Sequence, residues 1–147
     1  MARDVGKKKK TASSTDNKAL LESRRLACEI AHLAHDRHCF DIVVLELAAL
    51  SPVALHFVIC TGTSDQQIRS VAREIEQLGQ EKCFNVFGRA GIQQGRWAVI
   101  DFVDVVVHLF DAEYRKFYDL ELLWGDAPRI QWKRRRRKSA AEDTEKK

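Results

Sequence analysis

The sequence predicts a single α/β domain in which one mixed sheet of about five strands is flanked by helices. Two observations predict this fold class. The chain has 147 residues, of which 45% are hydrophobic, and this is enough for one core. Segments typical of strands alternate with segments typical of helices, in the order helix, two strands, helix, three strands, helix.

The first helix is predicted over residues 18–37, because apolar residues recur there every three or four positions. Its apolar positions are Leu26, Ala27, Ile30, Leu33 and Ala34. DIVVLEL at 41–47 and LHFVICT at 55–61 are rich in residues that strands favour, so they predict two buried strands.

The second helix is predicted to begin within TGTSDQQ, where Thr63 with Gln66, or Ser64 with Gln67, fits a capping box. Gly79 is placed to end this helix. The predicted buried stripe consists of Ile68, Val71, Ala72, Ile75 and Leu78.

CFNVF at 83–87 predicts a third strand, and the glycines at 88, 91 and 95 predict a loop before strands at about 96–102 and 105–110. Asp111 is placed to cap a last helix. The periodic residues of that helix are Phe117, Leu120 and Trp124, and its stop signals are Gly125 and Pro128.

GRWAVIDFVDVVVHLF, residues 95–110, places polar and large aromatic side chains in predicted strands. If Val103 and Asp104 form a two-residue turn, residues whose numbers sum to about 207 oppose each other and share a face. One face then carries Trp97, Val99, Asp101, Val106, His108 and Phe110. Two interpretations remain open, an exposed protein-binding surface or a face covered by a helix. Val103 is a weak point of this register, because a tight turn favours a residue that tolerates positive φ.

Other candidate sites have simpler explanations. Cys28, His32, His35 and Cys39 lie on one side of the first helix, but the outer two are roughly 16 Å apart, so we predict a polar helix face and no metal site. Asp101 and Asp104 are three residues apart, and alternation in a strand sends such carboxylates to opposite faces. We therefore predict no catalytic residue, no metal and no cofactor.

The two ends of the chain are basic and the body is acidic. Residues 1–18 and 133–147 hold 14 of the 25 basic and 5 of the 21 acidic residues, a balance of +9, which leaves −5 for 19–132. We expect residues 1–18 and 131–147 to be disordered tails. The run of Lys133, Arg134, Arg135, Arg136, Arg137 and Lys138 is predicted to bind RNA or another polyanion, the alternative being a solubilising tail.

The cysteines at 28, 39, 60 and 83 form no CxxC pair, and the N-terminus lacks the apolar segment of a signal peptide. No apolar run approaches the roughly 20 residues of a membrane span. We expect a soluble cytoplasmic protein with free thiols.

Four separated motifs then resemble one family: DIVVLEL, SPVALHFVICTGTSDQQIRSVAREI, RWAVIDFVDVVVHLF and FYDLELLWGDAP. Together they look like the ribosomal silencing factor (Iojap-like) family, from about Leu20 to Pro128, which gives a domain at 19–130. The resemblance implies a nucleotidyltransferase-like fold without catalytic acids. Val103 departs from the glycine that is common in this family before DVVVH.

The resemblance also implies a non-enzymatic translation repressor. Such a protein binds the large ribosomal subunit through large-subunit ribosomal protein fourteen and sterically blocks joining of the small subunit, especially under nutrient limitation. The binding surface carried over onto this chain consists of Trp97, Val99, Asp101 and His108. A general RNA-binding protein and a nucleotidyltransferase-like enzyme remain alternatives, and a homodimer of the free protein is plausible.

Overall fold

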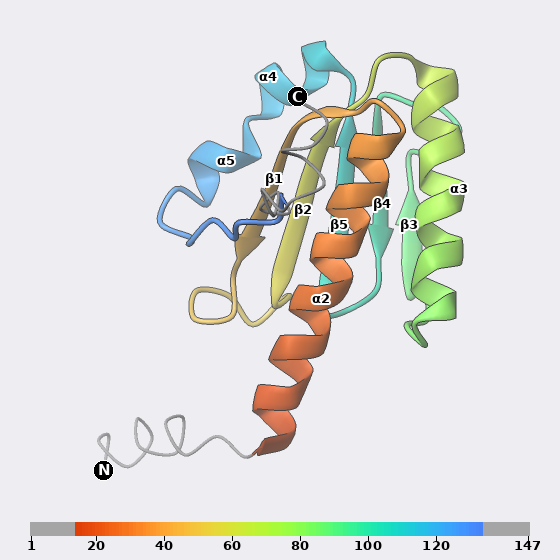
Figure 1. Cartoon of the computed structure of the whole chain (residues 1–147). Coiled ribbons are helices and arrows are strands. Elements are labelled where there is room, and N and C mark those ends of the chain that lie inside the picture. The colour runs from red at the N-terminus through yellow and green to blue at the C-terminus, as the bar shows by residue number, and fades with distance from the viewer. Residues whose placement is uncertain (1–13, 134–147) are drawn as a thin grey trace, which may run out of the picture.

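A single five-stranded mixed sheet organises the computed structural model, which describes residues 14–133 (Figure 1). The strand order is β1-β2-β5-β4-β3, the β2–β5 pair is parallel, and the other pairs are antiparallel. The strands are β1 (Phe40–Glu46), β2 (His56–Thr61), β3 (Gly88–Ala90), β4 (Trp97–Asp101) and β5 (Val105–Phe110). The predicted single α/β domain with a mixed sheet of about five strands is confirmed.

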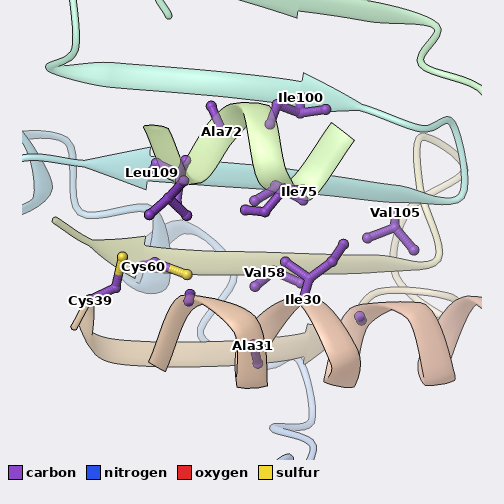
Figure 2. Packing of buried hydrophobic residues seen from close by; sticks show 14 of the residues in the cluster. Ile30, Ala31, Cys39, Val58, Cys60, Ala72, Ile75, Ile100, Val105 and Leu109 are labelled. Carbon is purple, nitrogen blue, oxygen red and sulfur yellow. The ribbon is translucent and has the colours of Figure 1, made fainter. Parts of the chain in front are cut away.

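Two long helices, α2 (Ser14–Asp36) and α3 (Asp65–Glu81), cover one face of the sheet. Their apolar stripes and the facing strand residues form the main core, in which Ile30 and Ile75 are fully buried (Figure 2). Helix α2 begins four residues before Lys18, so residues 14–18, predicted as part of the N-terminal tail, are helical. The other predicted tail residues, 1–13 and 134–147, lie outside the described part of the chain.

Helix α3 begins with the second of the two predicted capping pairs. The hydroxyl oxygen of Ser64 accepts a hydrogen bond from the backbone N–H of Gln67 at 3.0 Å. The side-chain oxygen of Gln67 reaches back and accepts the N–H of Thr63 at 2.7 Å. The first bond satisfies one of the N–H groups that a helix start leaves unpaired, and the second fixes Thr63, the residue before the N-cap.

Gly79 does not end α3, contrary to the prediction. The helix continues to Glu81, and the left-handed residue that ends it is Cys83, with φ 67°. The N–H of Phe84 bonds the carbonyl of Gly79 at 2.8 Å, and the N–H of Cys83 bonds that of Gln80 at 3.0 Å, which is the Schellman pattern. A glycine is favoured at position 79 for another reason: a Cβ there would lie 2.3 Å from the ring of Phe102.

The predicted strand at 83–87 is also wrong, because the third strand is Gly88–Ala90. The helix-ending motif occupies the backbone of Cys83 and Phe84, so the chain pairs with β4 only from the N–H of Phe87, which bonds the carbonyl of Asp101 at 2.7 Å. The loop that follows turns at Gly91 and Gly95, both at positive φ.

The single last helix predicted after Asp111 is two short helices, α4 (Ala112–Tyr118) and α5 (Leu120–Leu123). Asp111 does cap α4, because its carboxylate accepts the N–H of Tyr114 at 2.8 Å. The chain bends at Asp119, which is left-handed at φ 35°. The bend lets Leu120 and Trp124 pack on the second face of the sheet, while Phe117, predicted on the same periodic side, stays 78% exposed.

The segment after α5 runs along the outer edge of β1. The N–H of Glu46 bonds the carbonyl of Pro128 at 2.9 Å, and the N–H of Ile130 bonds the carbonyl of Val44 at 2.8 Å. The indole N–H of Trp132 then donates to the carbonyl of Ile42 at 3.1 Å. Ordered packing therefore continues to Trp132, directly before the basic run.

Candidate protein-binding surface

The register predicted for the hairpin of β4 and β5 is confirmed. Trp97 pairs with Phe110, Val99 with His108, and Asp101 with Val106, as expected for a two-residue turn. Because paired residues share a face, Trp97, Val99, Asp101 and His108 project from the same side of the sheet. We call these four residues the β4–β5 surface.

The turn that sets this register is strained at Val103. The N–H of Phe102 donates to the carbonyl of Val105 at 2.8 Å, and the N–H of Asp104 donates to that of Phe102 at 2.9 Å. Val103, at the centre of the second bond, has φ 77°, the geometry of a γ-turn that β-branched residues resist. The carboxylate of Asp101 stabilises it by accepting the N–H of Val103 at 2.7 Å.

Trp97 is held by three neighbours. Its ring stacks on Phe110 with centroids 4.9 Å apart, and the ring of Tyr118 from α4 lies 4.6 Å away. Its indole N–H donates to Nδ1 of His108 at 3.1 Å. Trp97 is therefore a half-buried side chain of fixed orientation.

His108 is buried, with 7% of its surface exposed. Since Nδ1 accepts from Trp97, the ring proton lies on Nε2, and Nε2 has no hydrogen-bond partner among the described residues. The ring of Phe57 is 4.6 Å away, and burial lowers the pKa of His108 from 6.5 to about 4. A neutral, buried His108 therefore orients the indole of Trp97 by accepting its N–H.

Both interpretations of this face hold for part of it. Helices α4 and α5 and the segment near Ala127 cover the region over β1, β2 and β5, where Phe110 is fully buried. On the β4 side, the side chains of Trp97, Val99 and Asp101 are only partly buried. An apolar surface with a carboxylate at its rim therefore remains accessible along β4.

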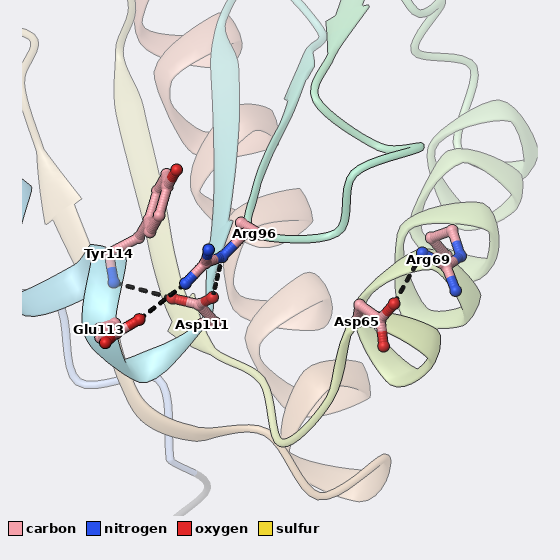
Figure 3. Close-up of polar contacts among 6 residues, drawn as sticks. All are labelled: Asp65, Arg69, Arg96, Asp111, Glu113 and Tyr114. Carbon is pink, nitrogen blue, oxygen red and sulfur yellow. Dashed lines mark hydrogen bonds and ion pairs between the residues drawn. The ribbon is translucent and has the colours of Figure 1, made fainter.

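Arg96 fixes α4 beside this surface, a role that the sequence did not reveal (Figure 3). Its guanidinium pairs with the carboxylates of Asp111 and Glu113, each at 2.7 Å, and lies 4.4 Å from the ring centroid of Tyr114. The carboxylates hold the pKa of Arg96 above its usual value. Arg96 follows the glycine loop directly, and only the folded hairpin shows that it reaches the start of α4.

The histidines and cysteines of the first helix do not converge. Cys39 lies beyond the helix end in the core, and Trp132 packs on His32 and His35 with ring centroids 5.5 and 5.8 Å apart. Within residues 14–133, no group of three or more His, Cys, Asp or Glu side chains is arranged to hold a metal ion. Asp101 is the last residue of β4 and Asp104 is in the turn, so the two carboxylates do not lie in one strand.

Only the first residue of the predicted polyanion-binding run is described. The ammonium group of Lys133 lies 5.8 Å from the ring centroid of Trp132. The rest of the run, Arg134, Arg135, Arg136, Arg137 and Lys138, falls outside the described residues. None of the helices in the described part is long and apolar enough to cross a membrane.

Comparison with known proteins agrees with these motifs. Residues 20–147 match the family model described as "Ribosomal silencing factor during starvation". The chain is 39% identical to ribosomal silencing factor RsfS of Bacillus subtilis over 77% of this chain and 91% of the relative. It is 34% identical to the chloroplastic protein Iojap of Arabidopsis thaliana over 75% of this chain and 46% of that protein.

Two solved structures share the fold. A protein of Chromobacterium violaceum superposes with a TM-score of 0.65 at 30% identity, over 72% of this chain and 86% of that one. A protein of Bacillus halodurans gives a TM-score of 0.61 at 33% identity, over 73% and 94%. The motifs, the fold and the relatives agree, and the chain belongs to the ribosomal silencing factor family.

Proposed function

We propose that the protein is a non-catalytic translation repressor that binds the large ribosomal subunit through large-subunit ribosomal protein fourteen and blocks joining of the small subunit, especially under nutrient limitation. The observation that carries the proposal is family membership, since the matched relatives are named ribosomal silencing factors. The partly accessible β4–β5 surface supports it, because an aromatic and aliphatic floor with a polar rim suits protein binding.

Each residue of the β4–β5 surface has a distinct role in this proposal. Trp97 and Val99 supply the apolar contact, and His108 keeps the indole in place from its buried position. Asp101 supplies negative charge toward a basic ribosomal protein. One of its oxygens bonds Val103, and the other has no hydrogen-bond partner within residues 14–133, so it is available to a cationic side chain.

The charge division supports the same partner. Residues 19–132 carry a balance of −5, and an acidic body speeds the encounter with a basic ribosomal protein. The basic run at 133–138 would add a contact with ribosomal RNA, raising the effective concentration without adding specificity. We further propose a cytoplasmic location and a homodimer of the free protein.

The first experiment is co-sedimentation with purified large ribosomal subunits. Asp101→Asn removes the charge but keeps an oxygen that can accept the N–H of Val103, so it separates binding from folding. Asp36→Asn on α2 is the matched control, because it changes the charge equally at an exposed position of the helix that covers the opposite face. We expect about tenfold weaker binding for Asp101→Asn and unchanged binding for the control.

Two further variants complete the test. Trp97→Ala should abolish sedimentation while far-ultraviolet circular dichroism stays that of the wild type. A chain ending at Lys133 keeps the anchored Trp132 and loses most of the basic run, so it should bind more weakly and with a smaller salt dependence. Binding that survives Trp97→Ala but disappears with the truncation would favour a general RNA-binding protein instead.

A further inference from the structure

Helices α4 and α5 carry the densest group of exposed apolar side chains in the described part of the chain. Ten large apolar side chains are exposed within residues 14–133, and four of them lie in the seven positions 117–123. They are Phe117 (78% exposed), Tyr118 (44%), Leu122 (78%) and Leu123 (70%). We call these four residues the α4–α5 patch. A concentration of apolar surface of this kind marks a site of contact.

The three most exposed residues of the patch, Phe117, Leu122 and Leu123, are not what holds the two helices in place. Neither helix contains a buried residue. Tyr114, Leu120 and Trp124 pack on the second hydrophobic cluster of the sheet. Arg96 pairs with Asp111 at the start of α4, and the guanidinium of Arg115 donates to the carbonyl of Asp41 at 2.6 Å and to the hydroxyl of Thr61 at 2.8 Å. Arg115 also pairs with Glu121 at 3.1 Å, which ties α4 to α5. The apolar side chains on the outside are therefore available to another surface.

The chain's own undescribed ends do not fit this patch. Residues 1–13 and 134–147 contain no aromatic residue, leucine or isoleucine, and their balance of charge is basic. They offer little that could fill an apolar surface made of Phe117 and two leucines. These two segments therefore do not supply the occupant of the patch.

Charge and position indicate which molecule. Residues 111–126 hold five acidic and two basic side chains, and Arg96 and Arg129, which pair with three of these carboxylates, bring the local balance to −1. The surround of the patch is therefore weakly acidic. Tyr118 belongs to the patch and also lies 4.6 Å from the ring of Trp97, so the patch is continuous with the β4–β5 surface. A partner with an apolar area bordered by basic residues would cover both at once.

We infer that the α4–α5 patch is the second half of the docking surface and binds the same basic protein partner as the β4–β5 surface. This inference rests on the proposed function. Phe117 and Leu122, the two most exposed members, are its anchors. The Trp97 side of the surface fixes the position of the partner, and the patch extends the contact along α4 and α5.

The test is co-sedimentation of the full chain with large ribosomal subunits, using the double variant Phe117→Ser/Leu122→Ser. Both side chains are 78% exposed, so the melting temperature should stay close to that of the wild type. We expect about tenfold weaker binding, since apolar anchors dominate the affinity of an interface. Phe87→Ser is the matched control, because Phe87 is 76% exposed and lies outside the patch, and it should bind as the wild type does.

The outcomes separate the two claims. A wild type that fails to sediment overturns the proposed function and with it the inference. If the wild type sediments and Phe117→Ser/Leu122→Ser sediments equally well, the inference alone is overturned. Analytical ultracentrifugation of the same proteins adds a third result: if the double variant loses only self-association and still binds the subunit, the patch joins two copies of this chain, and the inference is wrong.

Discussion

Asp101 shows how one side chain serves both the fold and the β4–β5 surface. One carboxylate oxygen accepts the N–H of Val103 and so stabilises the turn that sets the register of β4 and β5. Because this bond needs an oxygen and not a charge, substitution by asparagine separates the two tasks. Substitution by alanine would remove both and would confuse lost binding with a distorted hairpin.

Val103 is the residue at which the sequence conflicts most clearly with the backbone. Its φ of 77° costs a β-branched residue about 1 kcal/mol or more relative to glycine. We expect Val103→Gly to raise the free energy of unfolding by about 1 kcal/mol, measured by urea denaturation. The side chain is 51% exposed, so little packing is lost.

Val103→Ala provides the comparison for this prediction. It removes the branched carbon but keeps a Cβ at positive φ, so its gain should be smaller than that of glycine. Equal stability of the wild type and the glycine variant would show that the turn relaxes in solution.

The sequence was informative about paired residues and uninformative about left-handed ones. Alternation and the two-residue turn predicted the partners of Trp97, Val99 and Asp101 correctly, because side-chain direction in a strand is local. The left-handed positions His38, Cys83 and Asp119 carry no glycine, so composition gave no signal for them. Tertiary packing imposes these conformations on residues that do not prefer them.

At the scale of elements, Gly79 gives a second test. Alanine is the better helix former by about 1 kcal/mol, and Gly79 lies inside α3. A Cβ would nevertheless lie 2.3 Å from the buried ring of Phe102. We expect Gly79→Ala to lower the free energy of unfolding by about 1–3 kcal/mol, because overpacking outweighs propensity.

A paired substitution identifies the cause. Phe102→Leu makes room for the new methyl group, so adding it to Gly79→Ala should cost less than the sum of the two single changes. A stabilised Gly79→Ala would mean that α3 moves away from β4 without loss. Thermal denaturation of the four proteins gives the answer.

The two wrong elements, the strand at 83–87 and the single last helix, share a physical cause. Each was predicted from composition or periodicity. In each case a residue with left-handed backbone geometry changes the direction of the chain, so the predicted element does not form. At Cys83 the helix-ending motif delays pairing with β4 until Phe87. At Asp119 the bend leaves Phe117 exposed in the α4–α5 patch, although periodicity places it on the same side as Leu120 and Trp124.

At the scale of the whole molecule, the sequence could not decide whether a helix covers the face of the hairpin that carries Trp97. That outcome depends on Arg96 and Arg115 attaching α4 and α5 to distant strands, and such contacts have no local pattern. The family resemblance, by contrast, was readable because four motifs recur in order, and the family match confirms it.

Two buried histidines should make the stability of the whole fold depend on pH. Nδ1 of His56 donates to the hydroxyl of Ser23 at 2.9 Å, because that hydroxyl donates to the carbonyl of Leu20. Burial, with a smaller contribution from the charge of Arg24, lowers the pKa of His56 to about 4, and burial alone does so for His108. Both rings are therefore neutral in the folded protein at pH 7.

The sign follows from the unfolded chain, in which histidine has a pKa of about 6.5 and takes up a proton first. The contribution of the two neutral histidines to the free energy of unfolding is complete above a pH of about 6.5 and is lost as the pH falls toward about 4. The loss is on the order of 3 kcal/mol for each histidine. Urea denaturation between pH 7.5 and 4.5 should show this decline.

His108→Phe tests the assignment. It keeps an aromatic ring between Phe57 and Phe110 and should flatten the decline by about half. An unaltered slope in His108→Phe would assign the acid sensitivity to other groups.

The segment that runs along β1 has a consequence for shortened forms of the chain. The inner neighbour of β1 is β2, and on its outer side Val44 and Glu46 bond the backbone of Ile130 and Pro128. At the opposite edge, β3 is only three residues long. A chain cut before Pro128 would leave an open row of N–H and carbonyl groups along β1, on which a strand of a second molecule could add. Protein ending there should form aggregates that grow by strand addition, whereas protein ending at Lys133 should not.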